Sequence, residues 1–406
     1  MTAPAGWNRQ TLGELGRYLN GRGFKKQEWR SAGRPIIRIQ NLTGSSDDFN
    51  YFEGEADDRH VVHPGDLLVS WAATLGAYFW NGPEAVLNQH IFKVESYIDL
   101  KFHKYLLDYK LEELMRHTHG SGMVHITRGR FDAVPVDVPP VGEQRRIVDL
   151  LEDHLSRLDA AASYLDAALR RAEMLRWATV AEAVSVAGGR EVRLGDIASV
   201  RNGIFVSRPG SEPNGVPILR IGAVRSLSLD LSDLRYSERT EEDLREADGL
   251  AQPGDLLFTR YNGNPRFVGA CTAVPVDAPV LTYPDKLIRV RVTDDTALSE
   301  FIALACSVGA ARAEIQASVR TTAGQAGIAG RDLKNVTLTL PDLEAQRAAI
   351  SAARESGIAA TRLSKDLQAA HRRNATLRRS LLAAAFSGRL TGEAADLSEA
   401  EEMIGA

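Results

Sequence analysis

Residues 139–187 carry the longest regular hydrophobic pattern of the chain. Apolar residues recur there in alternating steps of three and four, at Val148, Leu151, Leu155, Leu158, Ala162, Leu165, Leu169 and Ala172. This spacing is typical of a coiled-coil seam and differs from the strict alternation of a strand. A helix of about 45 residues would extend ~65 Å, too far to bury its seam within one small domain. The pattern therefore predicts a partner helix.

A second helical pattern, in residues 341–386, supplies that partner. Its seam is drawn through Ala353, Ala360, Leu363, Leu367, Ala370, Leu377, Leu381 and Ala384, with Ser356 and Asn374 as polar interruptions. The start of the first helix also returns 202 residues later, with Pro139, Gln144, Arg145 and Val148 matching Pro341, Gln346, Arg347 and Ile350. The alternative, two unrelated surface helices, does not explain this repetition.

The repetition includes the segments that precede the helices. Short motifs return in unchanged order: residues 12–15 at 194–197, 20–21 at 202–203, 35–39 at 217–221, 64–70 at 253–259, 76–77 at 269–270, 91–94 at 287–290 and 126 at 328. The offset grows from 182 to 202 residues, as insertions in the loops of a second copy would produce. The sequence thus predicts an internal duplication.

Each copy has the pattern of an α+β domain. Strands are predicted at 35–39, 67–70 and 91–94, and again at 217–221, 256–259 and 287–292. Shorter helices are predicted at 100–117 and 296–319. The expected domains are a first globular domain (1–138), a central helix (139–189), a second globular domain (190–340), a C-terminal helix (341–390) and a tail (391–406). We call the two globular domains the first head and the second head. Antiparallel pairing of the long helices would separate the heads about a pseudo-two-fold axis, as in two-fold readers of DNA.

Composition gives no sign of a membrane or a secreted protein. Residues 1–30 lack the apolar core of a signal peptide, and no run approaches the ~18 apolar residues of a membrane helix. The two isolated cysteines, Cys271 and Cys306, suggest neither a zinc site nor a disulfide framework. We therefore expect a cytoplasmic protein.

Local charge differs from the net charge of −4. Residues 17–40 hold seven basic side chains and one acid, whereas acidic residues gather elsewhere, for example in 230–248. Basic side chains beside amides and aromatic rings are the groups that contact DNA phosphates and base edges; the alternative is a solvated charged face. The candidate DNA contacts are Arg22, Lys25, Lys26, Arg34, Arg38, Gln40, Asn41, Trp71, Arg128, Arg130, Arg201, Arg208, Arg220, Arg260, Tyr261, Asn262, Asn264, Arg266, Lys286 and Arg331.

Sequence motifs for catalysis are weak. The chain contains no G-x-x-x-x-G-K-[ST] phosphate loop and no N-P-P-Y tetrapeptide. A nuclease set could be drawn only from Asp285, Asp332 and Lys334, which are too widely spaced along the chain. The histidines His117, His119 and His125 lie beside arginines, without a carboxylate or cysteine to complete a metal site.

The repeated motifs resemble those of the specificity (S) subunit of type I restriction-modification systems, over nearly all of the chain. The resemblance is carried by PPVGEQRRI at 139–147, PDLEAQRAAI at 341–350, the paired PIIRI/PILRI and PGDLLVS/PGDLLFT segments, and SGRL at 387–390. Gly357 and the polar seam residues depart from the pattern and affect the expected helix register. In that family, two target-recognition domains alternate with two conserved helices that form an antiparallel coiled coil.

The resemblance implies a non-catalytic DNA-specificity subunit. Each head would bind one half of a bipartite DNA site, and the helices would dock two methyltransferase subunits, to which restriction subunits are added. S-adenosylmethionine, ATP and Mg²⁺ are expected on those partners, and no cofactor on this chain. The expected docking residues are Gln144, Arg145, Arg146, Arg170, Arg171, Gln346, Arg347, Arg372 and Arg373. The alternatives are a duplicated nuclease or methyltransferase and a protein–protein spacer that does not contact DNA.

Overall fold

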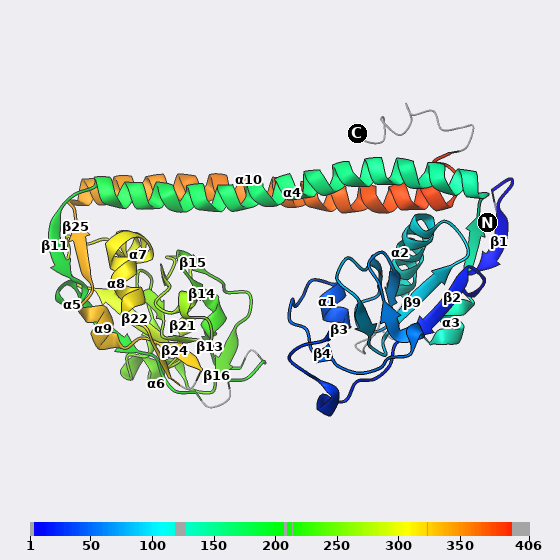
Figure 1. Ribbon diagram of the computed structural model, residues 1–406. Coiled ribbons are helices and arrows are strands. Elements are labelled where there is room, and N and C mark those ends of the chain that lie inside the picture. Colours follow the sequence, from blue (N-terminus) through cyan, green and yellow to red (C-terminus); the bar gives the residue numbers. More distant parts are fainter. Residues whose placement is uncertain (1–3, 118–126, 207–208, 213, 323, 392–406) are drawn as a thin grey trace. The chain divides into compact units, whose positions relative to one another are not determined.

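The computed structural model describes residues 4–117, 127–206, 209–212, 214–322 and 324–391. The chain forms two compact units, Met1–Leu165 with Ala369–Ala406, and Asp166–Gln368. Each unit holds one head and part of the two long helices (Figure 1). The predicted tail lies, apart from Thr391, outside the described residues.

The first head is built on two four-stranded sheets. The antiparallel sheet has the order β2-β9-β6-β7, and the mixed sheet has the order β4-β3-β8-β5 with β3 and β8 parallel. The strands are β1 (Asn8–Thr11), β2 (Gly16–Asn20), β3 (Arg34–Ile37), β4 (Tyr51–Phe52), β5 (Val61–Val62), β6 (Leu67–Ser70), β7 (Gly76–Phe79), β8 (Ala85–Leu87), β9 (Ile91–Ser96) and β10 (Pro135–Val138). The helices are η1 (Leu12–Glu14), η2 (Lys26–Glu28), α1 (Ile39–Leu42), η3 (Asp58–His60), α2 (Leu100–His117) and α3 (Arg128–Asp132).

The second head repeats both sheets with the same topology, as β12-β22-β18-β20 and β16-β13-β21-β17. Its strands are β11 (Arg190–Arg193), β12 (Ala198–Asn202), β13 (Val216–Ile218), β14 (Val224–Arg225), β15 (Ser228–Leu229), β16 (Arg235–Ser237), β17 (Leu250–Ala251), β18 (Leu256–Thr259), β19 (Tyr261–Asn262), β20 (Cys271–Ala273), β21 (Leu281–Thr282), β22 (Leu287–Val292), β23 (Arg320–Thr322), β24 (Gln325–Gly327) and β25 (Thr337–Leu340). Its helices are α5 (Leu194–Ile197), η4 (Ile221–Ala223), α6 (Glu241–Glu246), η5 (Pro265–Phe267), α7 (Ser299–Ser307), α8 (Gly309–Ala317) and α9 (Gly330–Lys334). The predicted duplication is confirmed.

The long helices are α4 (Val141–Val186) and α10 (Leu343–Phe386), which pack together (Figure 1). In the first unit the Asn374 amide donates a hydrogen bond of 2.8 Å to the carbonyl of Leu158, so this polar residue fixes the local register. Phe386 places its ring 5.4 Å from the rings of Phe102 and Tyr109, which joins α10 to the first head. In the second unit, Val180 of α4 clusters with Ile350 of α10 and with α7.

All predicted seam residues of α4 are buried or half-buried, whereas the seam drawn through α10 needs one correction. The Leu363 side chain is 46% exposed, and the neighbouring Ser364 is half-buried in its place. Alanine on several faces of α10 leaves little contrast between its buried and exposed positions. The hydrophobic pattern therefore could not distinguish these adjacent residues.

Four predicted elements end differently in the structure, and one of them is the strand expected at 91–94, which continues as β9 to Ser96. The helix expected at 296–319 is split into α7 and α8, because Val308 is extended and Gly309 has a φ of 62°. The strands expected at 35–39 and 217–221 stop at Ile37 and Ile218, before the short helices α1 and η4.

Two residues of the predicted docking surface, Gln144 and Gln346, do not lie on the surface of the protein. Both side chains are almost completely buried, with exposures of 2% and 0%. The Gln144 amide accepts from the N–H of Asp99 (2.9 Å) and donates to the carbonyl of Pro139, and Gln346 makes the equivalent bonds to Leu298 and Pro341. Each glutamine therefore joins the start of a long helix to its own head and is not available to a partner protein.

Candidate nucleic-acid interface

Three loops meet at one end of the antiparallel sheet in the first head. The ladder between β6 and β9 ends at Ser70 and Ile91, and just beyond it the N–H of Trp71 donates to the carbonyl of His90 (3.3 Å). The loop after β2 joins them, because the N–H of Gly21 donates to the carbonyl of Ile91 (3.0 Å). We call residues 20–22, 71–75 and 88–90 the loop end of the first head.

The second head has the same arrangement. The ladder between β18 and β22 ends at Thr259 and Leu287, and the N–H of Arg260 donates to the carbonyl of Lys286 (2.9 Å). The N–H of Gly203 donates to the carbonyl of Leu287 (3.1 Å). Residues 202–204, 260–264 and 284–286 form the loop end of the second head.

Three predicted contacts come together at the second loop end. The guanidinium carbon of Arg260 lies 4.7 Å, and the ammonium nitrogen of Lys286 lies 5.4 Å, from the ring centroid of Tyr261. Tyr261 packs on the backbone of β24, where a Cβ on Gly327 would come within 2.5 Å of the ring. Two cations therefore lie beside one aromatic ring, a combination that suits phosphates and base edges.

The first loop end presents mainly aromatic groups. The ring of Trp71 stacks on Phe92 (5.7 Å between centroids) and meets the ring of His90 edge-on (5.3 Å). Arg22 lies over the Phe24 ring (4.0 Å) and pairs with Glu28 (2.8 Å). His90 was not among the predicted contacts, although the repeat offset of 196 residues aligns it with Lys286.

Several predicted contacts form hydrogen bonds within their own head. Asn41 accepts from the N–H of Arg38 (3.0 Å) and donates to two carbonyls of its own loop, so its amide closes that loop. Asn262 and Asn264 each accept from the N–H two residues ahead. Arg128 donates to the carbonyl of Tyr18 (2.7 Å) and pairs with Asp132. These hydrogen bonds hold the loops in shape. Contact of these residues with DNA stays a prediction.

The other predicted contacts lie elsewhere on the heads. Six are exposed: Lys25, Lys26, Gln40, Arg130, Arg266 and Arg331. Arg34 is half-buried and pairs with Glu84 (3.4 Å), and Arg38 lies 5.7 Å from the Trp29 ring. Arg208 lies outside the described residues. No contact of these side chains tests the prediction that they bind DNA.

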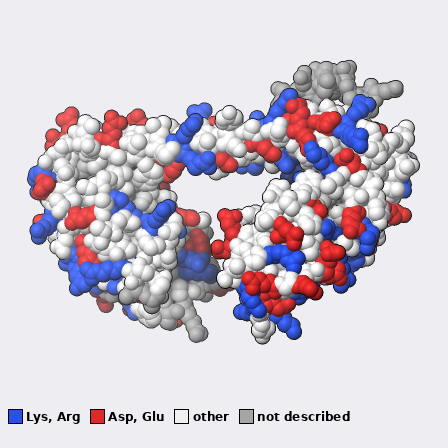
Figure 2. Space-filling view, viewed as in Figure 1, with Lys and Arg blue, Asp and Glu red and all other residues white. Residues whose placement is uncertain are grey.

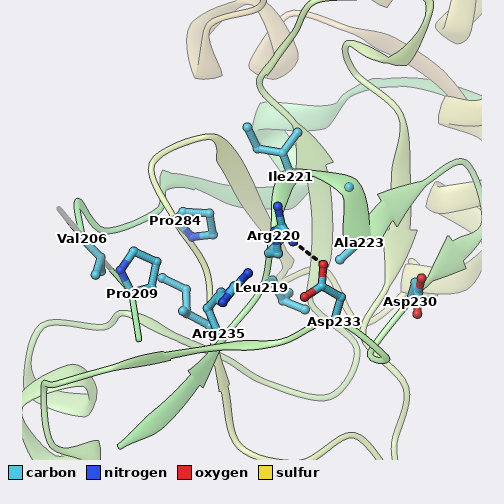
Figure 3. Close-up of a pocket in the computed structure, with 12 residues that line it drawn as sticks. Val206, Pro209, Leu219, Arg220, Ile221, Ala223, Asp230, Asp233, Arg235 and Pro284 are labelled. Atoms are coloured by element: carbon cyan, nitrogen blue, oxygen red, sulfur yellow. Dashed lines mark hydrogen bonds and ion pairs between the residues drawn. The ribbon is translucent and has the colours of Figure 1, made fainter. Parts of the chain in front are cut away.

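A pocket adjoins the second loop end and shares Pro284 with it (Figure 3). Arg220 lines this pocket and pairs there with Asp233. Arg235, from β16, donates to the hydroxyl of Ser211 (2.8 Å). The pocket wall thus carries two arginines, one of them neutralised by an aspartate.

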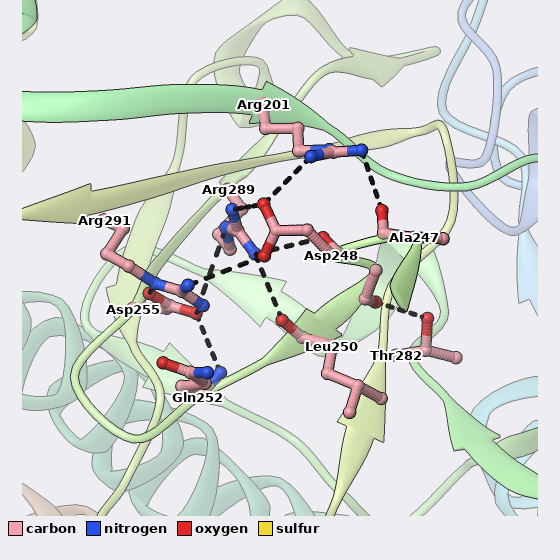
Figure 4. Close-up of polar contacts among 10 residues, drawn as sticks. Arg201, Ala247, Asp248, Leu250, Gln252, Asp255, Thr282, Arg289 and Arg291 are labelled. Carbon is pink, nitrogen blue, oxygen red and sulfur yellow. Dashed lines mark hydrogen bonds and ion pairs between the residues drawn. The ribbon is translucent and has the colours of Figure 1, made fainter. Parts of the chain in front are cut away.

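A network of charged side chains surrounds Arg289 of β22 (Figure 4). Arg289, with a side chain only 3% exposed, donates to both carboxylate oxygens of Asp248 (2.9 and 2.7 Å). This hydrogen bonding lowers the pKa of Asp248 to about 2. Arg201 also pairs with Asp248 (2.9 Å), and Arg291 with Asp255 (2.7 Å). Arg201, a predicted DNA contact, is 51% exposed at the edge of this network, and its role in DNA binding stays a prediction.

The charge segregation of the sequence is largely lost in three dimensions. Arg17, Arg34 and Arg220 pair with acids from other segments, namely Glu95, Glu84 and Asp233. Figure 2 accordingly shows acidic and basic side chains intermixed over the visible face of the molecule. Net local charge therefore does not locate a DNA surface. The loop ends are identified as candidate DNA surfaces from their side-chain geometry instead.

The described residues contain no group of three or more histidine, cysteine, aspartate or glutamate side chains that could hold a metal ion. Asp285 and Asp332, the nuclease candidates, lie in a turn and in α9. His119 and His125, and the side chain of His117, lie outside what the structure describes. Within the same described ranges, no helix is long and apolar enough to cross a membrane.

Comparison with known proteins gives consistent relatives. Residues 4–163 match the family described as the Type I restriction modification DNA specificity domain. The chain is 33% identical over 289 residues to the type I restriction enzyme EcoKI specificity subunit of Escherichia coli, an alignment that covers 68% of this chain and 61% of that relative. It is 24% identical to the EcoBI specificity subunit of Escherichia coli, covering 95% of this chain and 87% of that protein.

Solved structures support the fold. A chain from a study of complex assembly and conformational transition of the type I R-M system aligns with a TM-score of 0.73 at 19% identity, covering 96% of this chain and all of that one. The HsdS subunit from Thermoanaerobacter tengcongensis aligns with a TM-score of 0.50 at 20% identity, covering 96% and 99%. With the duplicated heads and the two long helices, these matches support the resemblance seen in the sequence: residues 4–163 match the type I restriction modification DNA specificity domain, and the chain is similar over most of its length to type I restriction enzyme specificity subunits.

Proposed function

We propose that this chain is the non-catalytic subunit that gives a type I restriction-modification complex its DNA sequence specificity. Each head binds one half of a bipartite, asymmetric site on double-stranded DNA. The helices dock two modification subunits, and restriction subunits join that complex. S-adenosylmethionine, ATP and Mg²⁺ bind to those partner subunits and not to this chain. We place the protein in the cytoplasm, in agreement with its two free, buried cysteines.

The single observation that carries this proposal is the duplicated loop end. Both heads build it from equivalent strands and equivalent backbone hydrogen bonds, yet with different side chains. An equivalent scaffold with different surfaces suits recognition of two different half-sites. The proposed boundaries are residues 1–138 and 190–340 for the two target-recognition domains, and 139–189 and 341–390 for the conserved helices.

Exchange of one head tests the proposal. Replacing residues 1–138 with the first domain of another family member should change one half of the methylated sequence and leave the other half intact. Sequencing of methylated positions in genomic DNA from cells that carry the complete system would measure this. Methylation without any sequence preference in the unmodified system would contradict the proposed function.

The helix pair offers a docking surface that differs from the predicted one. The seven predicted arginines are exposed, as expected of a docking surface. Large apolar side chains are exposed as well, which the sequence analysis missed: Tyr164, Met174, Leu175, Ile358 and Leu363, with exposures of 46–77%. Met174 and Leu175 are neighbours in α4, and exposed apolar groups that adjoin one another mark interaction sites. We therefore place the modification-subunit contact on these residues and the arginines.

Charged substitutions on this surface should block assembly. The double variant Leu175→Asp, Leu363→Asp would place two carboxylates in the apolar contact, and we expect at least a 100-fold weaker association with the modification subunit, measured by analytical ultracentrifugation. The thermal stability of the isolated subunit should change little, because both side chains are already exposed. The control variant, Ser185→Asp, lies on exposed α4 surface near the end of the helix, beyond Met174 and Leu175. Equal assembly of both variants would remove Leu175 and Leu363 from the interface.

A further inference from the structure

Two residue positions of each loop end correspond between the heads. Trp71 and Arg260 both directly follow the last ladder residue of their strand, and His90 and Lys286 both directly precede the first residue of the next strand in that ladder. In both heads the first member donates its N–H to the carbonyl of the second. The two pairs therefore occupy one equivalent place in the duplicated fold.

The backbone beneath these pairs is rigid in both heads. The ladder residues Ser70, Ile91, Thr259 and Leu287 have no exposed surface. A Cβ on Gly21 would lie 2.2 Å from the carbonyl oxygen of Asn88, and one on Gly203 would lie 2.1 Å from that of Pro284. The loop after β2 or β12 thus packs closely on the turn that carries the second member of each pair. A backbone packed in this way restricts the positions that the side chains attached to it can take.

The side chains at this place differ in kind. In the first head, the pair is a half-buried tryptophan and a histidine whose rings are in contact. In the second head, it is an arginine and a lysine grouped around the Tyr261 ring, and the lysine side chain is 41% exposed. Arginine and lysine are the preferred partners of the O6 and N7 acceptors of guanine, whereas an aromatic pair offers apolar and stacking contacts.

We propose that the pairs Trp71–His90 and Arg260–Lys286 determine the base preference of their heads, and that the second pair selects a guanine in its half-site. This inference rests on the proposed function and assigns it to four residues. The Asn-Gly turns at residues 20–21 and 202–203 are the same in both heads and cannot distinguish their half-sites. The two pairs differ in kind at an equivalent place, so a difference in base preference between the heads is expected there.

The test exchanges the pairs within the complete complex. The variant Arg260→Trp, Lys286→His gives the second head the side chains of the first, and Trp71→Arg, His90→Lys does the reverse. Each complex, with its modification subunits, selects duplexes from a library randomised in both half-sites. We expect the first variant to lose its guanine preference by about 10–100-fold at one position of the second half-site, with the first half-site unchanged. The reverse variant should change only the first half-site.

The controls separate base selection from other effects. Arg260→Lys keeps the charge and should weaken the preference without removing it. Arg245→Ala removes an exposed cation of α6 in the same head and should leave the preference intact. If the exchanged complexes bind DNA with unchanged preferences, or lose affinity equally for all sequences as phosphate contacts would, the inference is wrong. If the unmodified complex itself shows no sequence preference, the proposed function fails first.

Discussion

Replacing Asp255 with alanine is expected to lower the free energy of unfolding of the second head by about 3–5 kcal/mol. The Asp255 carboxylate is 2% exposed and accepts two hydrogen bonds from Arg291 and one from the N–H of Gln252. It also lies 4.0 Å from Arg289, whose side chain is 3% exposed. Its removal would leave three guanidinium groups, those of Arg201, Arg289 and Arg291, to share Asp248, with that of Arg289 buried.

The first head supplies a matched control, because Asp66 is the repeat counterpart of Asp255. Asp66 accepts from the N–H of His63 and pairs with Lys93 (2.9 Å), but its side chain is 26% exposed. Asp66→Ala should therefore lower the free energy of unfolding by less, about 1–2 kcal/mol. Hydrogen–deuterium exchange of β18 and β6 reports the two heads separately. Equal effects of the two substitutions would show that the burial of the second network does not determine its strength.

The same aspartates show what the sequence could predict. The repeated Pro-Gly-Asp motif indicates a turn into a strand, and both turns form, with Gly65 and Gly254 at φ angles of 92° and 85°. Each aspartate closes its turn through the N–H three residues before it, which is a local interaction. The cations at Lys93 and Arg289 come from a strand that follows much later in the chain. Local patterns therefore predict the turn and not its ion pair.

Periodicity predicted the fold because it reports burial on one face of an element. The bounds of β6, β18, β22 and α2 agree with the prediction. The predicted burial was wrong where the hydrophobic pattern is weak, as at Leu363 in the alanine-rich helix α10.

The candidate site was less predictable than the fold. Runs of arginine in the sequence cannot show that Arg128 donates to the Tyr18 carbonyl or that Arg201 pairs with Asp248, because those partners are distant in the chain. Gln144 was predicted on the surface because polar residues are mostly exposed, yet its amide is satisfied inside the first unit. Conversely, His90 gives no signal without the repeat alignment, which pairs it with a lysine.

A buried histidine in the first head should make this half of the molecule sensitive to acid. His103 has no exposed surface, and its ring nitrogens lie 2.8 Å from the hydroxyls of Tyr18 and Ser96. The Ser96 hydroxyl donates to the carbonyl of Ile98, so it accepts from Nδ1–H, and Nε2 accepts from Tyr18. The neutral ring thus satisfies every polar atom of this chain of hydrogen bonds. Burial lowers the pKa of His103 to about 4.

The free energy of unfolding of the first unit should therefore fall by up to about 3 kcal/mol between pH 6.5 and pH 4 because of this residue. The unfolded chain takes up a proton near the ordinary histidine pKa of 6.5, whereas the folded protein resists it until about 4, so stability is highest above 6.5 and is lost as the pH falls. Four of the five tryptophans, Trp7, Trp29, Trp71 and Trp80, belong to this unit. Denaturant titrations followed by tryptophan fluorescence at a series of pH values would measure the effect.

The second head shows how to remove this sensitivity. The repeat places Ile302, which is fully buried, where the first head has His103, and Val200 and Val292 where it has Tyr18 and Ser96. The variant His103→Ile should cost about 1–3 kcal/mol at neutral pH, because the buried Tyr18 hydroxyl loses its acceptor. It should also flatten the pH dependence between 6.5 and 4, which a purely steric defect would not do. An unchanged acid slope in this variant would assign the sensitivity to other groups and leave His103 with a packing role only.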